Sequence, residues 1–202
     1  VLARAHIELL VQRLPHLHQI WIFDLEKTRI AALQRELAPR LEANRVELQP
    51  TNTAEEAIRP AQLIVPVTTT TVGYIAYDWL QPGSLLVNIS LDDPLPEVVS
   101  KADKIIVDDW NLVKNDSRRL IGRMYRDGKV IGPDDSIEAR ENNCRRIDAQ
   151  LGEIVAGTRI GRSSSNDIIL VNPFGLSIED IALGAYVYQA ARERGIGVLL
   201  ER

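Results

Sequence analysis

Short apolar runs, many of them rich in β-branched residues, alternate with helical stretches along this 202-residue chain, and this alternation constrains the fold more than any other feature. The predicted strands lie at residues 20–23, 46–48, 63–67, 85–89, 105–107 and 168–171. Short apolar strands joined by helices form a parallel sheet that is covered on both faces, with right-handed crossovers. The sequence therefore predicts a doubly wound α/β domain.

Helical spacing and capping residues place the helices between these strands. We expect helices at residues 2–14, 26–42, 53–58, 96–102 and 177–195. The third begins at a capping box, and residues 177–180 cap the last, whose apolar stripe includes Ile181 and Tyr188. Residues 74–80 predict a helical turn, and residues 112–160 a more polar, helical stretch.

Charge and cysteine content exclude several classes of protein. The chain has 24 Lys and Arg against 28 Asp and Glu and no basic block, which argues against nucleic acid or an anionic membrane as a partner. No apolar run approaches the roughly 18 residues that span a bilayer. A single cysteine, Cys144, and three histidines without ligand spacing give no metal site and indicate a reducing compartment, the cytoplasm.

Asp24 directly follows the first predicted strand. A carboxylate at this place, roughly 20 residues past a glycine-rich turn, accepts hydrogen bonds from a ribose 2′-hydroxyl in dinucleotide-binding domains. Counting back from Asp24 reaches Ala3, which suits the last small residue of G-x-G-x-x-A. The first strand and its two glycines are then expected upstream of Val1, and Val1, Leu2 and Ala3 beside the cofactor. The alternative is that Asp24 caps the helix at 26–42.

Other strand ends supply further candidates, because ligands of doubly wound sheets bind at the carboxyl ends of the strands. The threonine run that begins with Thr68 and Thr69 offers hydroxyls to a nicotinamide or its ribose. Three polar residues, Asn88, Ser90 and Asp93, follow the next strand. Asn88 and Ser90 could orient backbone and carboxamide groups, and Asp93 is placed to act as a base.

Each remaining polar group has a structural interpretation. Either Asp92 or Asp93 could cap the helix at 96–102, and we expect Asp92 to face solvent. Asp108 and Asp109 are expected to cap the next helix or to pair with arginines. His6 is expected to be a core or interface imidazole, and Cys144 to have no role. Four arginines are expected to form a solvated or intersubunit face, with an anion site as the alternative: Arg118, Arg119, Arg123 and Arg126.

Six segments resemble the ornithine cyclodeaminase/mu-crystallin family. They are ARAHI, IFDLEK, VTTTT, LLVNISLDDPLPEV, KIIVDDW and NPFGLSIEDIA. The resemblance implies a two-domain homodimer with a Rossmann-type domain that binds NAD or NADP. Residues 1–175 would be that domain, without its first strand and the N-terminal substrate domain. Residues 176–202 would form a helix that returns to the substrate and dimer domain.

The family motifs also imply roles for individual residues. Asp24 matches the carboxylate on the adenosine ribose, and Asp93 matches the catalytic aspartate. The residues expected to bind NAD are Val1, Leu2, Ala3, Asp24, Thr68, Thr69, Asn88, Ile89 and Ser90. Cyclodeaminases carry a lysine a few residues after the aspartate, whereas Pro96 and Glu97 follow here, and a late serine is replaced around Asn172. Both differences argue against ornithine as the substrate.

The resemblance is strongest to the branch that makes 2,3-diaminopropionate for siderophores and peptide antibiotics. It implies an NAD-dependent oxidoreductase acting on an amino-acid C–N bond, which converts N-(2-amino-2-carboxyethyl)-L-glutamate to 2,3-diaminopropionate and 2-oxoglutarate. Three alternatives stay open. They are an ornithine cyclodeaminase, ketimine reductase or alanine dehydrogenase; a non-catalytic NAD(P)-dependent binding protein of the mu-crystallin type; and a methyltransferase with a reversed seventh strand.

Overall fold

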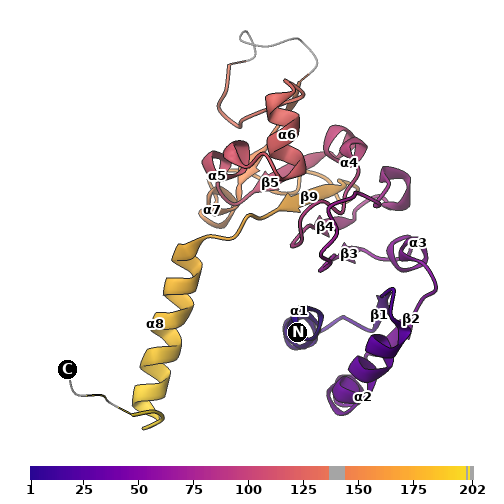
Figure 1. Cartoon of the computed structure of the whole chain (residues 1–202), viewed down its shortest axis with the longest axis vertical. Helices are drawn as coiled ribbons and strands as arrows, with labels where there is room; N and C mark the ends of the chain where they lie inside the picture. Colours follow the sequence, from indigo (N-terminus) through magenta and orange to yellow (C-terminus); the bar gives the residue numbers. More distant parts are fainter. Residues whose placement is uncertain (137–143, 199, 201–202) are drawn as a thin grey trace.

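A computed structural model describes residues 1–136, 144–198 and 200 of the chain (Figure 1). The largest sheet has five strands in the order β3-β4-β9-β5-β8. These strands are β3 (Leu63–Ile64), β4 (Leu85–Val87), β5 (Lys104–Val107), β8 (Ala149–Gln150) and β9 (Ile169–Asn172). Every strand pair in the described residues is parallel, which confirms the α/β class and lends no support to a methyltransferase with a reversed strand.

The main core lies between this sheet and the helices that cover it. Leu86, Ile105 and Leu170 from the central strands are almost fully buried, as are Val98 of α4 (Pro96–Lys101) and Ile121 of α6 (Leu120–Arg126). Burying such a side chain contributes about 1.5–3 kcal/mol. The same core includes residues of the short helices α3 (Ala54–Ile58) and α5 (Trp110–Asn115).

A second, smaller core holds the N-terminal part of the chain together. Strands β1 (Gln19–Ile22) and β2 (Glu47–Pro50) form their own parallel pair, flanked by α1 (Leu2–Arg13) and α2 (Lys27–Asn44). The predicted stripe of α2 is confirmed, because Ile30, Leu37 and Leu41 are buried and Leu33 packs against the same cluster.

Two strand edges have no strand beside them in the described residues. β1 pairs with β2 alone, and β3 pairs with β4 alone. In doubly wound sheets of order 3-2-1-4, the first strand lies between the second and the fourth. If β2, β1 and β3 are the third, second and fourth strands, one parallel strand is still required between β1 and β3. The expected upstream strand stays a prediction, and these two open edges are compatible with it.

Two helix predictions are confirmed only in part. Residues 112–160 contain α5, α6 and α7 (Leu151–Val155), but also β8 and the strand pair β6 (Val130–Ile131) and β7 (Arg145–Arg146). Two-residue strands are too short to show a period of two in the sequence. In the range 74–80, only Tyr77–Trp79 is helical, as the 3-10 turn η1. The backbone N–H groups of Tyr74 and Ile75 donate instead to the Asp93 carbonyl, at 2.8 and 2.9 Å.

The last helix, α8 (Ser177–Glu193), extends away from the sheet at the end of β9 (Figure 1). Its N-cap is Leu176 and no side chain caps it, so the predicted cap at 177–180 is wrong. The predicted stripe exists but is unburied, since Ile181 is 70% exposed and Tyr188 is 59% exposed. None of the described helices combines the length and the apolar character needed to cross a bilayer.

Candidate active site

Asp93 lies at the centre of a cluster of hydroxyl groups. Its side chain is fully buried, at 0% exposure. Thr68 Oγ1 donates to Asp93 Oδ1 at 2.7 Å, and Ser90 Oγ donates to Asp93 Oδ2 at 2.5 Å. The Tyr74 hydroxyl is a third partner; burial, and to a smaller extent the Asp93 carboxylate, raise the pKa of Tyr74, so it stays protonated. A buried carboxylate needs such partners, because an unpaired charge would be expensive to bury.

The carboxyl ends of two neighbouring strands bring these groups together. β3 and β4 are paired in register, with Leu63 opposite Leu85, and Thr68 and Ser90 each follow their strand by a few residues. Ser90 Oγ also lies 3.0 Å from the Pro66 carbonyl oxygen, which ties the two strand ends to each other. Gly73 permits the close approach of the tyrosine segment, since an added Cβ there would lie 2.9 Å from the Pro94 carbonyl oxygen.

Asn88 also follows β4, but its side chain joins two strands. Asn88 Nδ2 donates to Asn172 Oδ1 at 2.8 Å and to the Leu91 carbonyl at 3.3 Å. Asn88 and Asn172 are 1% and 4% exposed, and Asn88 Oδ1 has no partner among the described residues. The side chains that remain accessible at these strand ends include the exposed Thr68 and Thr69 and the half-buried Ile89.

Asp24 lies at the carboxyl end of β1 and is half-buried. Its Oδ1 accepts a hydrogen bond from the Glu26 backbone N–H at 2.8 Å. The N-cap of α2 is Glu26, so the alternative that Asp24 caps this helix is wrong. Of the three opening residues, Val1 and Leu2 are exposed and Ala3 is half-buried, at the start of α1.

Asp92 does not face solvent, contrary to the sequence-based expectation. It is 4% exposed, accepts a hydrogen bond from the Leu120 backbone N–H at 2.8 Å, and pairs with Arg123 at 2.9 Å. The N-cap of α4 is Leu95 without a side-chain hydrogen bond, so neither Asp92 nor Asp93 caps that helix. The two adjacent aspartates therefore make different contacts. Asp92 binds the start of α6, and Asp93 accepts hydrogen bonds from the hydroxyl cluster.

The pair Asp108–Asp109 is structural, as predicted. Asp109 caps α5 by accepting from the Leu112 N–H at 3.0 Å. Asp108 Oδ2 accepts from the backbone N–H groups of Phe174 and Gly175, both at 2.6 Å. These bonds hold the turn that leads from β9 into α8. The alternative pairing with Arg118 and Arg119 is not seen, because both arginines pair with Asp116.

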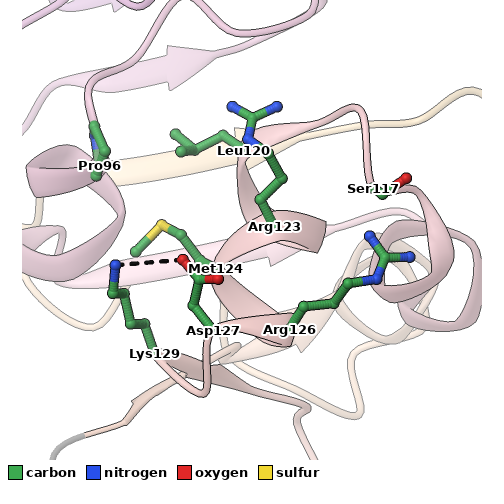
Figure 2. Close-up of a pocket in the computed structure, with 8 residues that line it drawn as sticks. All are labelled: Pro96, Ser117, Leu120, Arg123, Met124, Arg126, Asp127 and Lys129. Carbon is green, nitrogen blue, oxygen red and sulfur yellow. Dashed lines mark hydrogen bonds and ion pairs between the residues drawn. The ribbon is translucent and has the colours of Figure 1, made fainter.

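A pocket of about 340 Å³ lies beside α6 (Figure 2). Its lining is Pro96, Ser117, Leu120, Arg123, Met124, Arg126, Asp127 and Lys129. None of these residues was a candidate for catalysis or cofactor binding. Each cation already has a partner: Arg123 pairs with Asp92, Arg126 donates to the Asn115 carbonyl, and Lys129 pairs with Asp127. In the described part of the chain, no three His, Cys, Asp or Glu side chains gather as metal ligands.

Sequence reasoning did not select two residues of the strand-end region as candidates, Tyr74 and Asn172, and it named Asn172 only as the place where a late serine of the family is replaced. Tyr74 falls in a segment predicted to be helical, so nothing in the sequence connects it with Asp93. Asn172 ends an apolar strand, in the way Asn88 does, and this parallel is the signal that could have identified it.

Comparison with known proteins identifies the family. The sequence profile of the ornithine cyclodeaminase/mu-crystallin family matches residues 1–195. The chain belongs to this family. It is 33% identical over 195 residues to the N-((2S)-2-amino-2-carboxyethyl)-L-glutamate dehydrogenase of Staphylococcus aureus, covering 96% of this chain and 53% of that protein.

Solved structures support the same family fold. The crystal structure of CmnK is similar with a TM-score of 0.82 and 30% sequence identity, covering 98% of this chain and 54% of that one. The Thermococcus litoralis Delta(1)-pyrroline-2-carboxylate reductase, solved in complex with NADH and L-proline, has a TM-score of 0.80 at 24% identity, covering 98% and 57%. The Rossmann-type fold is confirmed. The chain spans about half the length of these relatives.

Proposed function

We propose that this chain is the cofactor-binding part of an NAD-dependent oxidoreductase that acts on the C–N bond of an amino acid. The observation that carries the proposal is the buried Asp93, held by the hydroxyls of Thr68, Ser90 and Tyr74 at the carboxyl ends of β3 and β4. Ligands of doubly wound sheets bind at these ends. A carboxylate in such surroundings is suited to general acid–base work.

The proposed substrate is N-((2S)-2-amino-2-carboxyethyl)-L-glutamate, which would yield 2,3-diaminopropionate and 2-oxoglutarate. Support comes from the Staphylococcus aureus dehydrogenase, which is 33% identical over nearly the whole of this chain. The residues Pro96 and Glu97, where cyclodeaminases carry a lysine, argue further against ornithine. The resemblance to the 2,3-diaminopropionate branch leads us to propose a role in the synthesis of a siderophore or peptide antibiotic, and the single cysteine, Cys144, leads us to propose the cytoplasm.

The residues at the strand ends fit NAD. Asp24, half-buried at the end of β1, can accept hydrogen bonds from a ribose 2′-hydroxyl and would repel a 2′-phosphate. The exposed Thr69 and half-buried Ile89 offer a hydroxyl and an apolar surface toward the nicotinamide end, beside the Asn88 backbone. Val1, Leu2 and Ala3, around the start of α1, would face the pyrophosphate. When bound, NAD would supply the acceptor for the hydride of the glutamyl Cα.

Asp93 would carry the proton in this reaction. After the hydride has left, water attacks the oxidised carbon, and Asp93 accepts the proton of that water. The same proton then goes to the leaving amine nitrogen as the C–N bond breaks, and the second proton of the water is released to solvent as the carbonyl forms, so Asp93 returns to its starting state. Transfer of this kind typically contributes about 10²–10⁴-fold to a rate.

The complete enzyme would include a further domain and form a homodimer. The open edges of β1 and β3 would receive one parallel strand from the segment before residue 1, which would also carry the glycine turn. Residues 1–175 would complete the dinucleotide-binding domain in this way. The exposed apolar side chains of α8 would pack on the substrate and dimer domain, since a helix that is apolar over much of its surface is normally buried.

A substrate panel with the full-length protein tests the proposal. NADH formation would be followed by absorbance with N-((2S)-2-amino-2-carboxyethyl)-L-glutamate, L-alanine, L-proline and L-ornithine, and 2-oxoglutarate would be measured in parallel. We expect one 2-oxoglutarate per NADH with the first compound and little turnover with the others. NADH formation with L-alanine or L-proline alone would replace the substrate assignment. Tight NAD binding with no turnover on any substrate would support a binding protein of the mu-crystallin type.

A further inference from the structure

Asp93 has no surface through which it could touch a substrate or an attacking water. Its exposure is 0%, and the chain around it is closely packed: Gly73, Tyr74 and Ile75 lie against residues 92–95 on one side. If these residues keep their conformation, the binding of a cofactor or of a further domain cannot expose Asp93, because binding only covers more surface. Another group must therefore connect Asp93 with the reacting atoms.

Only one of its three hydroxyl partners is exposed. Ser90 is 9% exposed and its hydroxyl lies between Asp93 Oδ2 and the Pro66 carbonyl, so it faces the interior. Tyr74 is half-buried, and its pKa is raised by burial and by Asp93, so it does not give up its proton readily. Thr68 is exposed, and its Oγ1 lies 2.7 Å from Asp93 Oδ1.

The hydrogen-bond geometry keeps Thr68 aligned for transfer. The Thr70 backbone N–H donates to Thr68 Oγ1 at 3.2 Å. A hydroxyl has one hydrogen and two lone pairs. With its hydrogen on Asp93 and one lone pair facing Thr70, Thr68 Oγ1 retains a second lone pair that can accept a proton from the exposed side.

We propose that the Thr68 hydroxyl is the catalytic contact through which Asp93 exchanges its proton with the reacting centre; this inference rests on the proposed function. As water attacks, its proton moves to Thr68 Oγ1 while the threonine's own proton moves to Asp93 Oδ1. In the return step, Asp93 gives a proton back to Thr68 Oγ1, and the hydroxyl proton of Thr68 goes to the leaving amine nitrogen. Thr68 ends each step as a neutral hydroxyl, and the second proton of the water is released to solvent as the carbonyl forms, so the protons balance.

Ser90 acts as a positioning residue in this arrangement. When Asp93 is ionised, the single Ser90 hydrogen serves Asp93 Oδ2. Because Ser90 holds Oδ2, the other carboxylate oxygen, Oδ1, stays turned toward Thr68. The charged groups nearest in sequence do not compete, because Asp92 is paired with Arg123 and turned toward α6.

Hydroxyl-deletion variants of the full-length protein test this proton relay, in which protons pass between Asp93 and the reacting centre through the Thr68 hydroxyl. Thr68→Val removes the hydroxyl and keeps the shape, Thr68→Ser restores the hydroxyl, and Asp93→Asn removes the base. We expect Thr68→Val and Asp93→Asn each to lower kcat by about 10²–10⁴-fold, with no further loss in the double variant, because both act in one proton path. Thr68→Ser should recover most of the activity, and the Kd for NAD, measured by calorimetry, should stay within about threefold.

The matched control is Thr158→Val. Thr158 is exposed after α7, next to β8 at the opposite edge of the sheet from β3, and its hydroxyl contacts only the Glu153 carbonyl in the described structure. This variant should keep the wild-type kcat. Circular dichroism of every variant verifies folding. The proton inventory of wild-type kcat in mixed H₂O and D₂O needs no variant, and it should curve, because two protons move together.

The outcomes separate the relay from the proposed function. Wild-type kcat in Thr68→Val with an inactive Asp93→Asn would overturn the relay and leave Asp93 as the base. An increased Kd for NAD at unchanged kcat in Thr68→Val would make Thr68 a cofactor contact instead, and a linear proton inventory would also overturn the relay. Wild-type turnover in Asp93→Asn would overturn the proposed function itself.

Discussion

Replacing Asp92 tests whether this aspartate has a structural role, in contrast to its neighbour Asp93. Asp92→Ala removes the acceptor of the buried Leu120 N–H, and an unpaired buried donor costs about 1–3 kcal/mol. It also removes the ion pair with Arg123, which contributes at most about 1 kcal/mol because that side chain is 44% exposed. The expected loss in the free energy of unfolding is therefore about 1–4 kcal/mol.

Two further variants divide this loss into its parts. Asp92→Asn keeps an oxygen for the Leu120 N–H and loses only the charge, so we expect about 1 kcal/mol or less. Asp78→Ala, at an exposed carboxylate on η1, serves as the control and should change stability by less than about 0.5 kcal/mol.

The assay is urea denaturation of the full-length protein followed by tryptophan fluorescence. Amide hydrogen exchange at Leu120 reports the same contact locally, and its protection should fall in Asp92→Ala. If Asp92→Ala is no more destabilising than Asp78→Ala, Asp92 faces solvent after all, and the account of its contact with α6 is refuted.

Three other predictions follow from single contacts. Gly122→Ala should destabilise the protein by about 1–3 kcal/mol in urea denaturation, because the added Cβ would collide with the Asp116 carbonyl oxygen; an unchanged midpoint would contradict this. The pKa of Asp116 is lowered from its ordinary value of 3.8, chiefly by the hydrogen bond from Arg118, so its stabilising contribution is present above that value and is lost as the pH falls through the lower folded pKa. Asp116→Asn should therefore flatten the acid limb of a stability–pH curve below about pH 4, and an unchanged limb would count against the contact. Asp24→Ala should reduce the preference for NAD over NADP in calorimetry by at least about tenfold, whereas an unaltered ratio would remove Asp24 from the ribose site.

Local sequence patterns predicted those elements whose contacts lie close in the chain. The stripe of α2 and the capping of α3 by Thr53, which accepts from the Glu56 N–H at 3.1 Å, both depend on residues three or four positions apart. Most of the longer parallel strands were predictable for a similar reason, because they carry several apolar residues in succession, many of them β-branched.

Contacts between distant segments could not be predicted in this way. Asp92 meets Leu120, 28 positions away, and no local pattern distinguishes it from its neighbour Asp93. The position of β9 between β4 and β5 likewise depends on the whole sheet. The family motif nevertheless selected Asp93 as the catalytic candidate, while its hydroxyl cluster became visible only when β3 and β4 were paired.

The central claim is that Asp93 carries the proton in NAD-dependent cleavage of an amino-acid C–N bond. The most direct measurement compares the rate of NADH formation from N-((2S)-2-amino-2-carboxyethyl)-L-glutamate by the wild-type full-length protein and by Asp93→Asn, with the Kd for NAD determined on both. We predict a rate that is about 10²–10⁴-fold lower in the variant at a similar Kd. Equal rates for the two proteins would contradict the claim.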